Sequence, residues 1–294
     1  MMDCRCYDDD CVIHKLTLDQ KMYATTFLNE TNNGKKNAIM EIKRWIQESN
    51  DLCARTDDFF ILRFLRACKF NIEKTKTKMW NYYKQRSILP EWYTNKDPFR
   101  SELQELFNIG VFLPLRQLDN EGRMVILLRV TRHNPSIHTL SNVIKVGLMT
   151  LDVLTRDHVA GSVCGVVAFI DLDGVKMGHV SQLRPDIVHN VVHAWQGCYP
   201  LRIQALNFIN APEYVDVILR LFKRLMNEKL KQRIHVYTSK MKDSCLKNVP
   251  ADRLPAEYGG TNGTIDELKA YWKKIVEDNR DWIIDDEKYK VIKK

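Results

Sequence analysis

One segment, residues 203–237, places a strand, an amphipathic helix and a second strand in immediate succession. Ile203–Ile209 and Ile234–Tyr237 are short, mostly apolar runs, as expected of buried strands. Two strands that are joined through a helix pair in parallel within one sheet, and the helix packs on a face of that sheet. The segment therefore predicts an α/β fold with a largely parallel sheet.

The helix between these strands, Pro212–Met226, carries different side chains on its two sides. Its residues advance by about 100° each, which gathers apolar residues on one side and basic residues roughly opposite. From Arg220 to Arg233 the sequence contains six basic residues and one acidic residue. This pattern is typical of a helix that covers an apolar cavity and presents charge to anionic headgroups, and equally of an ordinary surface helix packed on a sheet. The apolar side comprises Tyr214, Ile218, Leu221, Phe222 and Leu225, and the basic side comprises Arg220, Lys223 and Arg224.

The rest of the chain extends the alternating pattern. Further strands are predicted at Met124–Val130 and Val163–Leu172, with helices from Ser141 to His158 and from Ser181 to Trp195. The fold class is thus α/β, a helical N-terminal subdomain followed by a mostly parallel sheet flanked by helices. We expect four parts: a loosely ordered lead (1–37) with one short helix near 18–28, a helical domain (38–98), an α/β domain (99–262), and a C-terminal helix capped by Thr264 with its tail (263–294).

Composition indicates a soluble intracellular protein. The chain has 294 residues, of which 45% are hydrophobic, so it can bury a large core. No run approaches the roughly 18 consecutive apolar residues of a spanning helix, and the N-terminus lacks the apolar core of a secretory signal. Eight scattered cysteines favour reduced thiols over disulfides. The net charge of +8 favours anionic surfaces in general.

Motifs for catalysis are missing. The sequence has no nucleophile elbow, phosphate loop, dinucleotide fingerprint or zinc-protease motif. Asp171 and Asp173 end a strand, where they suit a turn through Gly174 better than acid catalysis. Two sets of residues could bind a metal. His189 and His193, four residues apart, are better explained as solvated side chains, and Cys4, Cys6, Cys11 and His14 as part of a loosely ordered tail.

Four blocks of sequence carry a family resemblance. The segment from Tyr199 to Tyr237, together with Asp57–Arg86, Phe169–Leu183 and Leu254–Gly260, resembles the CRAL-TRIO lipid-binding domain in the expected order. Within that family the chain is most similar to the animal branch that contains the tocopherol-transfer and retinaldehyde-binding proteins. The resemblance implies that the helix Pro212–Met226, hereafter the gate helix, closes a pocket for a hydrophobic lipid.

The resemblance also implies which residues face the lipid. Gly147 and Leu151 stand where tocopherol-transfer proteins offer serines, which leaves fewer polar groups for a hydroxylated chromanol. Leu201 follows Tyr199-Pro200 where members that exchange phosphatidylinositol carry a glutamate, which counts against that cargo. The expected pocket comprises Ile144, Gly147, Leu148, Leu151, Phe169, Ile170, Val191, Ala194, Trp195, Leu206, Phe208, Ile218, Phe222 and Leu225.

By the same resemblance, five basic residues fall on positions that contact phosphoinositide phosphates: Arg63, Arg66, Arg202, Lys229 and Arg233. Several cations that converge on one phosphorylated ring give charge-assisted hydrogen bonds stronger than a lone surface pair. Cys68 replaces a third arginine of the tocopherol-transfer branch, so one expected headgroup contact is missing.

The sequence as a whole predicts a cytoplasmic, monomeric lipid-transfer protein without enzymatic activity, metal or cofactor other than its bound lipid. The cargo would be a retinoid, tocopherol, carotenoid or similar isoprenoid. Its partners would be that small molecule and anionic phosphoinositide lipids of endosomal or other membranes, where it would bind peripherally, and not nucleic acid. Two alternatives stay open: a trafficking adaptor that uses the same basic surface without exchangeable cargo, and a lipid-acting enzyme that uses Asp171 or Asp173.

Overall fold

A five-stranded sheet forms the centre of the α/β part. The computed structural model describes residues 16–238, 246 and 249–292. The strand order is β2-β3-β4-β5-β6, with β2 antiparallel to β3 and the other neighbours parallel, which confirms the predicted fold class. The strands of this sheet are β2 Phe112–Pro114, β3 Met124–Leu128, β4 Val166–Asp171, β5 Ile203–Ile209 and β6 Ile234–Val236.

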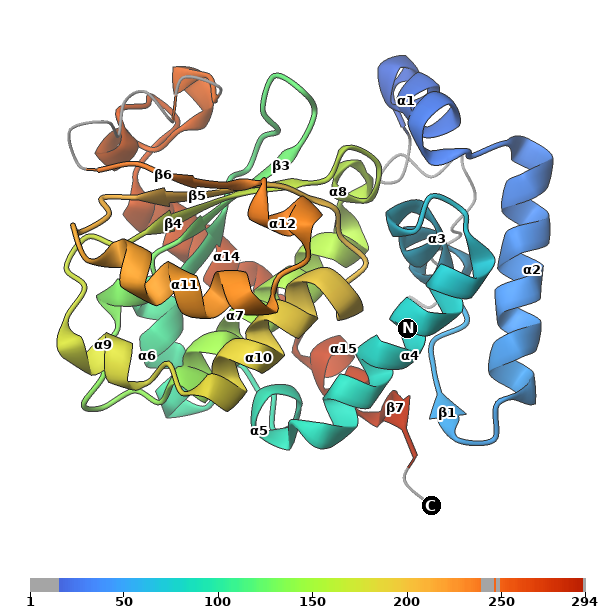
Figure 1. Ribbon diagram of the computed structural model, residues 1–294, viewed down its shortest axis with the longest axis horizontal. Helices are drawn as coiled ribbons and strands as arrows, with labels where there is room; N and C mark the ends of the chain where they lie inside the picture. The colour runs from blue at the N-terminus through green and yellow to red at the C-terminus, as the bar shows by residue number, and fades with distance from the viewer. Residues whose placement is uncertain (1–15, 239–245, 247–248, 293–294) are drawn as a thin grey trace.

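Helices cover both faces of this sheet. On one face, β4 places Ala168 and Ile170 in a buried cluster with residues of α10 and α11. On the other face, Phe169 packs in a cluster with Trp272 of α14. Figure 1 shows α7, α10 and α11 below the sheet in that view and α14 behind it. These helices are α7 Leu140–Asp157, α10 Pro185–His193, α11 Val215–Leu225 and α14 Ile265–Asp278, with the shorter α8 Val159–Cys164, α9 Met177–Ser181, α12 Glu228–Lys231 and α15 Arg280–Asp285.

Two predicted elements begin later in the structure than expected. The expected strand Val163–Leu172 begins only at Val166, because α8 extends to Cys164 and is capped by Gly165, whose φ of 90° favours glycine. A side chain there would also collide with the carbonyl oxygen of Arg202, 2.4 Å from the position of its Cβ. The expected helix from Ser181 to Trp195 begins only at Pro185, as α10, because proline suits the first turn of a helix; Ser181 is instead the last residue of the short helix α9.

The N-terminal helices form a separate group at the right of Figure 1. The lead is more ordered than expected: α1 matches the predicted short helix, its Leu28 is fully buried, and α2 already begins at Asn32. Asp57 caps α3 by accepting from the backbone N–H of Phe60. This group comprises α1 Leu18–Leu28, α2 Asn32–Glu48, α3 Asp58–Ala67 and α4 Ile72–Ile88, with a two-stranded sheet of β1 Leu52–Cys53 and β7 Lys290–Val291. Two further helices, α5 Pro90–Tyr93 and α6 Ser101–Ile109, follow and pack against α7.

A buried ionic cluster joins the N-terminal helices to the C-terminal end of the chain. The carboxylate of Asp286 lies 2.6 Å from Arg86, 2.7 Å from Arg55 and 3.4 Å from Lys96. Lys96 also lies 3.5 Å from Asp152 of α7. Burial opposes the ionisation of Asp286, but the three cations hold the pKa of its carboxyl well below the usual range. The carboxyl of Asp286 is thus ionised at neutral pH.

We expect Asp286→Asn to lower the free energy of unfolding by about 3–5 kcal/mol, because it leaves buried cations without their counter-charge. Asp285→Asn is the matched control, because Asp285 pairs with Lys288 at the surface and such pairs contribute about 1 kcal/mol or less. Urea unfolding of the two variants checks this. Equal midpoints for the two variants would contradict a structural role for the cluster.

Candidate functional site

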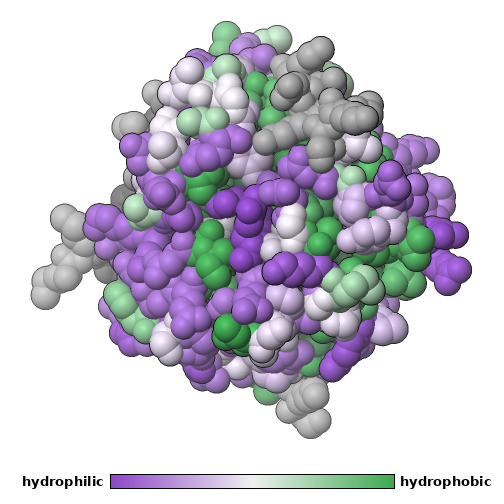
Figure 2. Space-filling model, turned by 90° about the vertical axis from the view of Figure 1, so that its left-hand side faces the viewer, coloured by the Kyte–Doolittle hydropathy of each residue, from purple (hydrophilic) through white to green (hydrophobic). Residues whose placement is uncertain are grey.

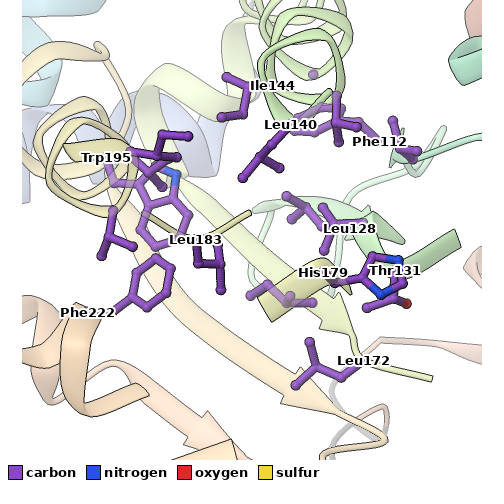
Figure 3. A pocket seen from close by; sticks show the side chains of 18 of the residues that line it. Phe112, Leu128, Thr131, Leu140, Ile144, Leu172, His179, Leu183, Trp195 and Phe222 are labelled. Atoms are coloured by element: carbon purple, nitrogen blue, oxygen red, sulfur yellow. The ribbon is translucent and has the colours of Figure 1, made fainter. Parts of the chain in front are cut away.

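An apolar cavity of about 280 Å³ lies between the sheet and the helices α7, α10 and α11. Figure 3 shows side chains from several of these elements converging on it. No charged residue is among the described residues that line it. Most of the residues expected in the pocket are found there: Ile144, Gly147, Leu148, Leu151, Ile170, Val191, Ala194, Trp195, Phe208, Ile218 and Phe222.

Three residues expected in the pocket lie elsewhere. Phe169 points to the opposite face of β4, because neighbouring residues of a strand alternate between faces. Leu206 is on the same face as Phe208 but belongs to the buried cluster with Met226 and Leu230, beyond the cavity. Leu225 is 39% exposed, because it lies at the end of the gate helix and turns outward.

Other lining residues were not anticipated. Trp92 of α5 reaches the cavity from the predicted helical domain (38–98), and Phe112 of β2 reaches it from the first part of the predicted α/β domain. Phe112 also explains Gly147, because a Cβ there would lie 3.1 Å from its ring. Val180 and Leu183 come from the segment after β4. Val180 precedes the helix predicted from Ser181, and Leu183 lies within its first turn; their apolar side chains were the one signal that could have revealed them.

The gate helix, α11 in the structure, presents a different inner face from the one predicted. Val215, Ile218, Leu219 and Phe222 line the cavity, a spacing of three and four residues along one stripe. The ring of Phe222 stacks on Trp195 with centroids 6.2 Å apart and planes inclined by 17°. Figure 3 shows these two rings together at one end of the cavity.

One side chain ties the end of the gate helix to the cavity wall. The amide of Gln196 donates to the carbonyl of Leu225 and accepts from the backbone N–H of Asn227, each at 3.0 Å. Gln196 belongs to a π-helical turn, Ala194–Cys198, that extends α10. Such turns are frequent at functional sites. Few polar contacts therefore hold this end of the helix against α10.

The outer face of the gate helix mixes apolar and basic side chains. Val217 and Leu221 are 57% and 47% exposed, which differs from the predicted burial of Leu221. Arg220 and Arg224 are exposed beside them, with no ion pair to any described residue. Figure 2, which shows the side of the molecule with α9 and the start of α11, likewise has hydrophobic patches among hydrophilic ones.

A second cationic feature, hereafter the basic cluster, consists of Arg202, Lys229 and Arg233. Burial lowers the pKa of Lys229, and the nearby charges of Arg233 and Lys69 lower it further. Burial and Arg202 likewise lower the pKa of Arg233. Arg233 donates to the carbonyl of Ile203, and none of the three residues pairs with a carboxylate among the described residues. The cluster thus concentrates positive charge that the described protein does not neutralise.

Arg63 and Arg66 are not part of this cluster. Both are buried, with exposed fractions of 4% and 2%. Arg66 forms a bidentate pair with Glu30 at 2.7 and 2.8 Å, and Arg63 donates to the hydroxyl of Thr155 at 2.7 Å. They join α3 to its neighbours. Their side chains are therefore engaged inside the protein, in contrast to the expected contact with phosphoinositide phosphates.

Potential catalytic and metal-binding groups are occupied by structural contacts. Asp171 accepts from the amide of Asp173 at 3.0 Å and from the hydroxyl of Tyr258 at 2.6 Å, which closes the turn after β4 as expected. Asp173 pairs with Arg132 at 2.5 Å. Among the described residues no group of three or more His, Cys, Asp or Glu is placed to hold a metal. Cys4, Cys6, Cys11 and His14 lie outside the described residues.

Comparison with known families agrees with this architecture. Residues 109–260, about half of the chain, match the CRAL/TRIO domain, and residues 31–103 match the Pinta-like UBA domain. The chain belongs to the CRAL/TRIO family of lipid-binding proteins. This confirms the resemblance found in the sequence. Among the described residues of this CRAL/TRIO protein, no helix has the length and apolarity to cross a membrane.

Individual relatives place the chain in the animal branch of the CRAL/TRIO family. It is 32% identical to the alpha-tocopherol transfer protein-like protein of Mus musculus over 225 residues, 76% of this chain and 64% of that protein. It is 27% identical to clavesin-1 of Xenopus laevis over 235 residues, 80% of this chain and 70% of that protein. The chain thus spans somewhat less than two thirds of the mouse relative. The crystal structure of Sfh5 shares the fold, with a TM-score of 0.51, 17% identity, and coverage of 85% of this chain and 99% of that one.

Stability should depend on the protonation of His193, which adjoins the π-helical turn. Burial lowers its pKa, and the charges of His189, Lys78 and Lys84 lower it further. The unfolded chain therefore binds this proton more readily, so the free energy of unfolding falls as the pH drops below about 6.5. His193→Gln should weaken that dependence between pH 7.5 and 5.5, whereas the exposed control His235→Gln should keep it. Urea titrations at both pH values test this, and an unchanged pH dependence in His193→Gln would contradict it.

Proposed function

We propose that this chain binds an apolar lipid in the cavity and transfers it between membranes in the cytoplasm. The observation that carries the proposal is a cavity lined by apolar side chains and closed by a helix whose outer face is also partly apolar. Burial of the lipid at about 25 cal/mol per Å² of apolar surface would supply most of the affinity. The relatives named for alpha-tocopherol transfer support a cargo of the isoprenoid type.

The gate helix would respond to the membrane through its outer face. Val217 and Leu221 lose contact with water when they enter the headgroup region, and Arg220 and Arg224 meet anionic phosphates there. Both effects favour a position of the helix on the lipid surface rather than against the cavity. Contact with a membrane would thus promote release and uptake, and the protein would bind membranes peripherally.

The basic cluster would select a phosphoinositide. Arg202 immediately precedes β5, and Lys229 and Arg233 lie between the gate helix and β6, so the cluster is close to the gate helix in the chain. Burial and the repulsion between these cations lower the pKa of Lys229 and Arg233, and a multiply charged phosphate among them would relieve the repulsion. We infer that no hydrolase, kinase or dehydrogenase reaction accompanies transfer, because Asp171 and Asp173 are held in structural contacts.

Phe222→Asp should open the gate and release cargo without any membrane. The carboxylate would face an apolar wall, which costs several kcal/mol if it stays buried. Leu225→Asp is the matched control on the same helix, because Leu225 is exposed and lies outside the cavity lining. Retention of the apolar fluorophore diphenylhexatriene during gel filtration measures the effect. If Phe222→Asp retains the probe as well as Leu225→Asp, the helix is not a gate.

The two basic surfaces should differ in lipid selectivity. Lys229→Glu with Arg233→Glu should abolish the preference for vesicles that contain phosphatidylinositol bisphosphate over phosphatidylserine vesicles of equal charge. Lys223→Glu with Arg224→Glu, the same change in charge on the gate helix, should weaken sedimentation with both vesicles alike, by about 1 kcal/mol per residue. Both effects should diminish with salt. If the two double variants prefer vesicles with phosphatidylinositol bisphosphate over phosphatidylserine vesicles to the same extent, the basic cluster is not a phosphoinositide site.

A further inference from the structure

The polar side chains of the cavity wall restrict the chemistry of the cargo. Most of them already bond to the protein. Thr131 donates its hydroxyl proton to the carbonyl of Asp173 at 2.6 Å, and the hydroxyl of Tyr199 lies 3.4 Å from the carboxylate of Asp152. These hydroxyls are therefore not free to donate to a ligand.

The two histidines on the wall are also engaged. His179 accepts from the backbone N–H of Lys176 at Nδ1, so its Nε2–H donates to the carbonyl of His133 at 3.0 Å. His133 faces the carbonyl of Val130 with Nδ1 and the side-chain oxygen of Gln182 with Nε2. Neither ring has a nitrogen left for a ligand.

The indole N–H of Trp195 is different, because it has no hydrogen-bond partner among the described residues. Its ring lies on the wall at the gate end of the cavity, beside Phe222, whereas Thr131 and His179 lie toward the other end (Figure 3). Trp92 carries the other indole N–H on the wall without such a partner. An indole N–H only donates, so each of these groups is available to an acceptor atom of a ligand.

On this basis, and resting on the proposed function, we propose that the cargo is a neutral apolar molecule with a carbonyl or ether oxygen that accepts from Trp195 beside the gate. A carboxylate or phosphate does not fit, because none of the described residues that line the cavity is a lysine or arginine that could offset its burial.

The test uses four ligands with one polyene skeleton: retinaldehyde, retinol, retinoic acid and the corresponding hydrocarbon. Each competes with diphenylhexatriene for the purified full chain. Retinaldehyde and retinol, which are neutral and carry an oxygen that can accept from Trp195, should bind more tightly than retinoic acid. Trp195→Phe keeps the ring against Phe222 but removes the donor, so it should weaken retinaldehyde binding about twofold to tenfold and leave the hydrocarbon unchanged.

The outcomes separate the two proposals. If neither diphenylhexatriene nor any polyene binds, the proposed function fails. If the ligands bind but Trp195→Phe affects the aldehyde and the hydrocarbon equally, or if Trp92→Phe alone weakens the aldehyde, the assignment to Trp195 is overturned while the lipid pocket stands. Unchanged affinity of Trp195→Phe for diphenylhexatriene shows that the cavity itself is intact.

Discussion

The charge on Asp286 organises much of this molecule. It brings together Arg55 before α3, Arg86 of α4 and Lys96 before α6, three segments far from it in the sequence. A buried carboxylate is stable only when cations and donors surround it, so none of these segments can shift alone. The N-terminal helices are thereby attached firmly to the α/β part of the chain.

The same cluster supports the cavity wall. Asp152 of α7 contacts both Lys96 and Tyr199, and Tyr199 follows the π-helical turn that carries Trp195 and Gln196. The ring of Tyr199 also packs edge-on against Tyr82 of α4, with centroids 5.4 Å apart. Side chains on the wall of an apolar cavity have protein packing partners on one side only, so contacts on that side must hold them in place. Here the contacts behind the wall are ionic and aromatic.

Sequence reasoning predicted most of the fold because the relevant signals are local. The run of apolar residues predicted β5 from Ile203 to Ile209, and the residue type of Thr264 predicted the cap of the C-terminal helix. The structure reproduces both. Local signals do not show which face of a strand meets a cavity, so Phe169 was placed on the wrong side. Nor do they show that Arg66 finds Glu30, a partner 36 residues away that decides whether its charge is free. Contacts between distant segments, rather than propensity, determined these errors.

The amphipathic character of the gate helix was predicted correctly, but the residues of its inner face were not. A helix that packs permanently on a sheet needs one apolar stripe, and Val215, Ile218, Leu219 and Phe222 supply it. A second set of apolar residues, Val217 and Leu221, then remains exposed at a cost in water. With apolar residues on both sides, no single helical wheel distinguishes inside from outside. The ambiguity itself is informative, because a helix that exchanges a cavity for a membrane surface needs an apolar face toward each.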